Sequence, residues 1–142
     1  MQSGRLKYLL NRFSKSKVYL AYDGDMVRLV SSDAVLGLRD GPVHFIHLEK
    51  QHRDFGEMYN DEAEFSPQRI QAMAGISYRQ LNTWVDRGLF APIRQRGKTR
   101  SFGAYEAFVA LVLGKFRAQG ASMTCIECLA RFLSENAEPE RE

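Results

Sequence analysis

The stretch 66–88 constrains the fold of this chain most, because the signals that start and end a helix occur twice within it. Ser66 can accept a hydrogen bond from the free amides at the start of a helix, and Pro67 suits the first helical position. Gly75 suits the left-handed residue with which many helices end. These signals predict a first helix from Pro67 to about Met73.

A second helix follows after this short turn. Ser77 can cap a helix from Tyr78 to Arg87, and Gly88 can end it. The helical period turns its apolar residues mostly inward: Leu81, Trp84 and Val85. The same period exposes a polar set: Tyr78, Arg79, Asn82 and Thr83. We therefore expect helix, short turn and helix, with polar side chains on the outer face of the second helix.

The residues after Gly88 predict a two-stranded hairpin, or wing. Apolar residues at Leu89, Phe90 and Ile93 lead into a basic, glycine-containing stretch that ends before Phe102. The cations of this stretch occupy alternate positions: Arg94, Arg96, Lys98 and Arg100. Alternate residues of an extended strand point to the same side, so we expect one row of positive charge.

Two more helices are expected to brace this wing and complete the core. From Ala104 to Ala118 apolar residues recur at helical spacing, and Gly120 stops the pattern. Ser122 can start a last helix that reaches Leu133.

The first 60 residues predict a small α+β unit. It contains a helix at 5–13, a hairpin of 18–22 and 26–30, a helical turn at 31–38 and a strand at 43–48. The charged stretch 49–64 is expected to be a linker or an exposed helix. The predicted fold class is therefore α+β, in three parts: this unit in 1–60, a mainly helical winged helix-turn-helix domain in 65–136, and an acidic tail in 137–142.

Charge is segregated along the chain. The net charge of +3 permits a nucleic-acid partner without requiring one. Basic residues gather between 87 and 100, with Asp86 as the only acid beside them, while residues 135–142 are acidic. Hydrophobic residues at 44% and charged residues at 26% are typical of a globular protein.

Several function classes find no support in the residues. No apolar run approaches the roughly 18 to 20 residues that span a bilayer, and no signal peptide is recognisable, so we expect a cytoplasmic protein without a membrane partner, which would be nucleoid-associated if it binds DNA. No phosphate-binding loop and no nucleophile with a base is present. Glu106 and Glu127 are expected on helix surfaces. An enzyme is therefore not expected.

The cysteine and histidine residues do not predict a metal site. Cys125 and Cys128 form a C-x-x-C motif, but zinc needs about four ligands, and the pair falls within a helix beside core residues. His44 and His47 fall on opposite faces of a strand, where one of them is expected to be buried and hydrogen-bonded, and His52 is expected to be exposed. We expect no metal, no cofactor and no disulfide.

A helix held across a short turn by a second helix fits the major groove of double-stranded DNA. Arg79 can bind guanine or a phosphate, and Tyr78 and Asn82 can bind a phosphate or adenine. A row of cations on the wing suits the phosphate backbone or a narrow minor groove. The alternative for the wing is an ordinary solvated hairpin.

The chain resembles the DNA-binding domain of the MerR family. AGISYRQLNTWVDRGLFAP, RGKTRSF and FRAQGASMTCIECLARFL follow one another in the family's order, between Ile70 and Leu133, or about half of the chain. The resemblance implies that the second helix enters the major groove, opened by Ser77, Tyr78 and Arg79, while Arg100 and Phe102 take the wing's usual arginine and aromatic positions. Asn82 and Thr83 stand where members commonly have arginine and tyrosine.

The order of the parts departs from that family. Its members begin with this domain and continue into a long dimerisation helix, whereas here about 60 residues precede the domain and an acidic tail follows it. A homodimer, if one forms, would be expected to use the N-terminal unit.

The sequence thus predicts a sequence-specific transcriptional regulator of the bacterial type, most simply a repressor, that binds double-stranded DNA. Its predicted DNA-binding residues are Ser77, Tyr78, Arg79, Asn82, Thr83, Arg87, Arg94, Arg96, Lys98 and Arg100. Two alternatives remain: an architectural, excisionase-like factor of a mobile element, and an antitoxin-like or adaptor protein whose residues 18–48 bind a protein partner.

Overall fold

The computed structural model describes residues 5–13, 18–22, 26–31, 44–48, 55, 62–97 and 99–137. In chain order its elements are α1 (Arg5–Phe13), β1 (Val18–Tyr22), β2 (Val27–Ser31), β3 (His44–His47), α4 (Pro67–Ala74), α5 (Tyr78–Asp86), β4 (Arg94–Arg96), β5 (Thr99–Ser101), α6 (Ala104–Ala118) and α7 (Met123–Ala137). Helices and small antiparallel sheets together confirm the α+β class. The helical turn expected at 31–38 lies outside the described residues beyond Ser31, which ends β2.

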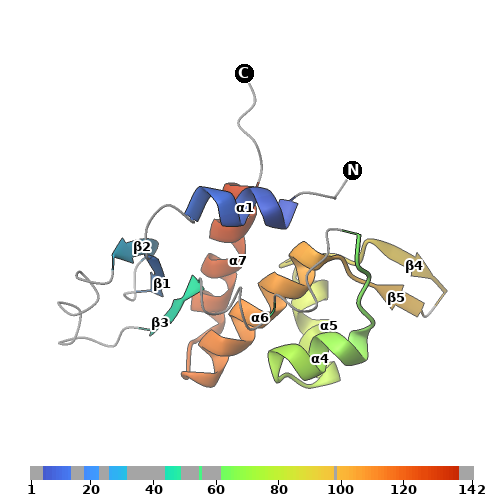
Figure 1. Ribbon diagram of the computed structural model, residues 1–142. Coiled ribbons are helices and arrows are strands. Elements are labelled where there is room, and N and C mark those ends of the chain that lie inside the picture. Colours follow the sequence, from blue (N-terminus) through green and yellow to red (C-terminus); the bar gives the residue numbers. More distant parts are fainter. Residues whose placement is uncertain are drawn as a thin grey trace.

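Helix α6 forms the centre of the molecule, with α7 packed beside it (Figure 1). Most residues of α6 are buried, from Ala104 through Gly114 and again at Phe116. A helix that is apolar on nearly all sides needs neighbours on all sides. Figure 1 shows α1 lying across α7, the three-stranded sheet at one end, and α4, α5 and the β4–β5 hairpin at the other.

The contact between α4 and α6 requires a glycine. A Cβ at Gly114 would lie 2.1 Å from the carbonyl oxygen of Ala74, far closer than van der Waals contact allows. Gly114 therefore lets α6 approach the end of α4 and sets the position of the helix pair α4–α5 against the core.

The N-terminal strands form an antiparallel sheet in the order β2-β1-β3. Leu20 and Ile46 are paired in register and face the core, where both are buried. The outer edge of β3 is covered by Gln119, whose amide accepts from Phe45 N at 3.1 Å and donates to Phe45 O at 2.9 Å. Because an open strand edge invites pairing with another chain, this contact closes part of that edge.

One aromatic residue corrects the expectation for the stretch 49–64. Phe55 is helical and only 1% exposed, so at this position the stretch is neither a linker nor an exposed helix. Its ring lies 5.9 Å from that of Phe65 and 6.0 Å from that of Phe108. Phe55 therefore belongs to the same core as α6, while its neighbours 49–54 and 56–61 lie outside the described residues.

Glu106 is also not the surface residue that the sequence predicts, because it is 4% exposed. It occupies the third position of α6, where its carboxylate accepts from the backbone amides of Gly103 and Glu106 and lies 3.5 Å from Arg5 Nη1. Burial raises the pKa of this carboxyl above its usual value, and the two amides and Arg5 offset that rise only in part. Arg5 in turn lies 3.9 Å above the ring of Tyr105.

Both described histidines are half-buried, so the expectation that His44 or His47 is buried is wrong. The His47 ring packs edge-on against Tyr19 at 4.8 Å. His52 lies outside the described residues.

Candidate nucleic-acid interface

The helix pair α4–α5 has the caps that the sequence predicts. Ser66 Oγ accepts from Arg69 N at 3.2 Å, and Ser77 Oγ accepts from Gln80 N at 3.0 Å. Between them Gly75 has a φ of 69°, a left-handed conformation that favours glycine. The short turn thus joins two capped helices.

Helix α5 is anchored by its inner face. Leu81 and Trp84 are 0% and 1% exposed, so the helix cannot rotate without opening the core. Its outer face carries Tyr78, which is 52% exposed, together with the exposed Arg79 and Thr83. A rigid helix thus presents an aromatic hydroxyl and a guanidinium at its first turn.

Two of the predicted DNA-contact residues form hydrogen bonds with the backbone of α5 itself. Ser77 is its N-cap, and Thr83 Oγ1 donates to the carbonyl of Arg79 at 3.0 Å. No hydrogen bond or ion pair to another described residue occupies the Arg79 guanidinium. Arg79 is therefore the cation of α5 that is best placed to bind a partner.

The hairpin β4–β5 does not carry one row of cations. Its register pairs Arg94 with Ser101, Gln95 with Arg100 and Arg96 with Thr99. Directly paired residues share a face of the sheet, so Arg94 and Arg96 lie on one face and Arg100 lies on the other. The single row that alternation predicts is therefore wrong, because the chain reverses direction between Arg96 and Thr99, and this register places Arg100 on the face opposite Arg94 and Arg96. Lys98 lies outside the described residues.

Arg100 faces helix α5. Its Nη2 donates to Asn82 Oδ1 at 2.5 Å, and both side chains are half-buried. Its guanidinium carbon lies 5.8 Å from the ring centroids of Tyr78 and Phe102. The structure thus brings Tyr78, Asn82 and Arg100 together where the hairpin meets the helix.

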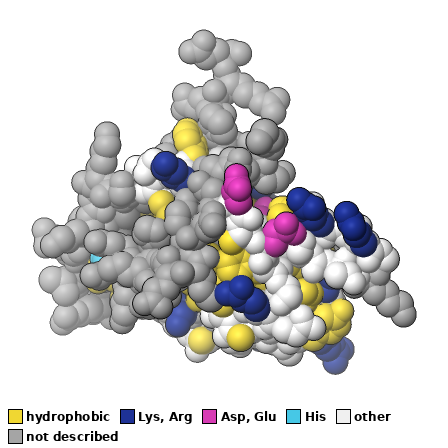
Figure 2. Space-filling view, turned by 45° about the vertical axis from the view of Figure 1, so that its right-hand side comes forward, with side chains coloured by type: hydrophobic (Ala, Val, Ile, Leu, Met, Phe, Trp, Pro, Cys, Tyr) yellow, Lys and Arg dark blue, Asp and Glu magenta, His cyan; other side chains and the backbone are white. Residues whose placement is uncertain are grey.

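Two other predicted DNA-binding arginines are held by acids. Arg94 Nε lies 3.4 Å from Glu64 Oε1, which also accepts from Ser101 Oγ at 2.8 Å. Figure 2 shows basic side chains with acidic ones beside them on the side of the molecule where the hairpin projects. Glu64 compensates part of the positive charge of this hairpin face, which nothing in the local sequence pattern signals.

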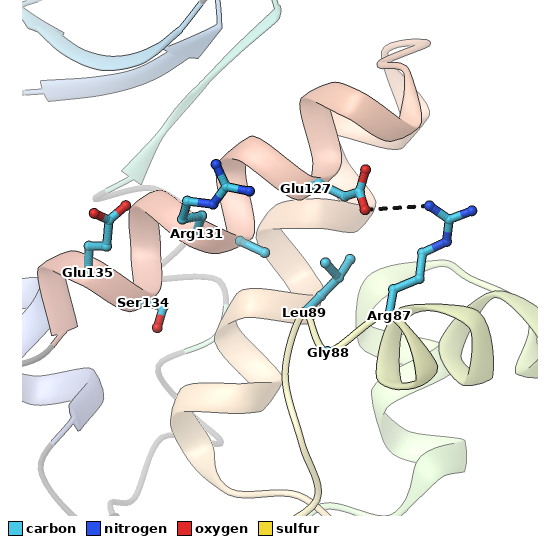
Figure 3. A pocket seen from close by; sticks show the side chains of 8 residues that line it. Arg87, Gly88, Leu89, Glu127, Arg131, Ser134 and Glu135 are labelled. Carbon is cyan, nitrogen blue, oxygen red and sulfur yellow. Dashed lines mark hydrogen bonds and ion pairs between the residues drawn. The ribbon is translucent and has the colours of Figure 1, made fainter.

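Arg87 is directed toward α7 (Figure 3). Its Nη1 lies 3.4 Å from Glu127 Oε2, at the edge of an open pocket of about 300 Å³ between the residues that follow α5 and helix α7. Arg131 and Glu135 also line this pocket, so its charges nearly balance. This ion pair directs the Arg87 side chain toward α7 and away from the first turn of α5.

The cysteines lie within α7, in the helix where the sequence predicts them. Cys125 is buried, and burial raises the pKa of its thiol to about 11, while Cys128 is half-buried. Among the described residues no group of three histidine, cysteine or acidic side chains could hold a metal ion. Nor is any helix in the described ranges long and apolar enough to cross a membrane.

No family model, curated protein or solved structure matches this chain. What α5 and the β4–β5 hairpin can bind has therefore to be judged from their own geometry and charge.

Proposed function

We propose that this chain is a sequence-specific double-stranded DNA-binding regulator of the MerR-like winged helix-turn-helix type, and most simply a repressor that occludes a promoter. In this proposal α5 enters the major groove and the β4–β5 hairpin lies along the flanking backbone. The observation that carries it is the exposed pair Tyr78 and Arg79 at the first turn of a helix whose opposite face is locked by Trp84. Groove-reading helices present their N-terminal side chains to base edges in this way.

The side chains divide into two chemical roles. Arg79 can bind guanine through two parallel hydrogen bonds, because no other described residue engages the donors of its guanidinium. Arg96, which is exposed and has no ion-pair partner among the described residues, suits a phosphate. Arg87 and Arg94 contribute less, because Glu127 and Glu64 partly compensate their charges.

Fluorescence anisotropy tests the proposal with a duplex from the gene's own upstream region and an unrelated duplex of equal length, each at two salt concentrations. We expect selective binding that weakens steeply with salt, since each neutralised phosphate adds about 0.9 to the salt slope. Arg79→Glu should abolish selective binding. The matched control is Lys7→Glu, which makes the same charge change at an exposed position on α1 and should bind almost as the native chain does.

The other outcomes identify the alternatives. Equal, weak binding to both duplexes would favour an architectural role of the excisionase-like kind. No binding to either duplex would contradict a DNA-binding function altogether.

A second candidate function, binding of a protein partner or of a second copy through the N-terminal sheet, has one observation in its favour. Phe45 and Met26 are 36% and 56% exposed, and large apolar side chains of this kind are common at interfaces. The mass of the chain in solution, by light scattering, tests the homodimer. A dimer that Phe45→Ser converts to a monomer would support it, and a monomer at all concentrations would contradict it.

A further inference from the structure

The contact between Asn82 and Arg100 joins the two elements of the proposed DNA-binding surface. We propose that Asn82 is a positioning residue, which holds the Arg100 guanidinium between α5 and β5 so that Arg100 can bind one phosphodiester of the DNA backbone. Asn82 itself reads no base. This inference rests on the proposed function and assigns a role to one residue of that surface.

The chemistry of the two side chains supports this role. A guanidinium has donors only, so the atom of Asn82 that it contacts has to be the carbonyl oxygen Oδ1. Asparagine recognises adenine with its oxygen and its amino group together. Because Oδ1 is engaged with Arg100, Asn82 does not offer both groups to one base.

The neutrality of Asn82 matters as much as its hydrogen bond. Arg94 and Arg87 are held by the carboxylates of Glu64 and Glu127, which compensate their positive charge. Among the described residues the partners of Arg100 are the Asn82 amide and two aromatic rings, all uncharged. Arg100 is thus held in place with its full charge, and its remaining donors can bind a phosphate oxygen.

The rings narrow the positions that Arg100 can take. Tyr78 and Phe102 lie at the same 5.8 Å from its guanidinium carbon, the first on α5 and the second directly after β5. A guanidinium held by one hydrogen bond between two rings loses little further freedom when it binds. This preorganisation is what a positioning residue contributes.

The test compares Asn82→Leu, Arg100→Ala and the double variant in the full chain, by anisotropy with the upstream duplex over a range of salt concentrations. We expect each single variant to weaken binding about tenfold, which corresponds to roughly one charge-assisted hydrogen bond. Each should also lower the salt slope by about one unit. The double variant should bind no more weakly than Arg100→Ala, because Asn82 acts only through Arg100.

Sequence preference provides a second readout. A set of duplexes with single base-pair changes should keep its affinity ranking in Asn82→Leu, since the lost contact is to a phosphate. Asn136→Leu is the matched control, because it makes the same change at a half-buried asparagine of α7, outside the proposed DNA-binding surface, and should leave the salt slope unchanged. Circular dichroism and the urea midpoint verify that each variant is folded.

The variant Asn82→Asp distinguishes the effect of the position of the Arg100 guanidinium from the effect of its charge. The carboxylate keeps an acceptor for Arg100 but compensates its charge, so we expect the low salt slope of Arg100→Ala although the contact persists.

Three results would overturn the inference: an altered base ranking in Asn82→Leu with an unchanged salt slope, additive losses in the double variant, or native affinity in Asn82→Leu. If the native chain binds no duplex, the proposed function itself fails and this role of Asn82 fails with it.

Discussion

Glu106 shows how burial makes a single residue sensitive to pH. Its pKa is raised from the usual 4.5 by burial, so the folded chain binds this proton more tightly than the unfolded chain does. Between pH 4.5 and the raised pKa the folded state therefore carries more protons, and its stability falls as pH rises through that range.

Replacing Glu106 by Gln should remove this decrease of stability with rising pH. A glutamine at the third helical position can still accept from the Gly103 amide, so the start of α6 is preserved. We expect the free energy of unfolding, measured in urea, to decrease less between pH 4.5 and pH 7 in Glu106→Gln than in the native chain. Glu127→Gln is the control and should retain the native pH dependence, because Glu127 is not buried. Parallel pH profiles of Glu106→Gln and the native chain would contradict this role of Glu106.

At the scale of the element, helix α5 depends on Ser77 for its start. Ser77 Oγ satisfies the Gln80 amide at 3.0 Å, so Ser77→Ala should lower the free energy of unfolding by about 1 kcal/mol. Ser77→Asn keeps a capping oxygen and should restore most of that loss. Urea unfolding measures both variants.

The same pair separates a cap from a DNA contact. If Asn restores DNA affinity together with stability, Ser77 acts through the helix, as its hydrogen bond indicates. If stability returns while affinity remains low, the serine hydroxyl itself contacts DNA. Ser66→Ala, the equivalent cap of α4, is the control for a helix whose first turn is not proposed to contact the duplex.

At the scale of the whole molecule, the buried residues of the N-terminal elements and of α4 to α7 belong to one hydrophobic cluster. Phe55 connects the two halves of the chain through Phe65 and Phe108. We therefore expect a single unfolding transition, with the same midpoint by circular dichroism and by the fluorescence of Trp84, the only tryptophan.

Phe55→Ala should move both signals together, with a loss of about 3 to 5 kcal/mol, because it removes a fully buried ring from that cluster. Phe45→Ala, at an exposed phenylalanine, should cost far less. Two separate transitions, with Trp84 unaffected by Phe55→Ala, would show that 1–60 and 65–136 unfold independently.

The sequence by itself determined where most helices and strands begin and end. Ser66, Gly75 and Ser77 act on amides and carbonyls within one turn of their own position, so their effect can be recognised without any knowledge of the packing. The outward position of Arg79 follows from the helical period for the same reason. These local rules predicted most of α4, α5 and the hairpin strands, and with them the candidate residues.

Only the tertiary structure decided what those residues contact. Arg87 and Glu127 are 40 positions apart in the chain, and Arg100 and Asn82 are 18 apart, so no local pattern connects them. The face on which Arg100 lies depended on the register across the hairpin turn, and the burial of Phe55 and Glu106 depended on which elements pack against them. The physical reason is range: caps and periodicity act over about four residues, whereas ion pairs and burial depend on how distant elements meet.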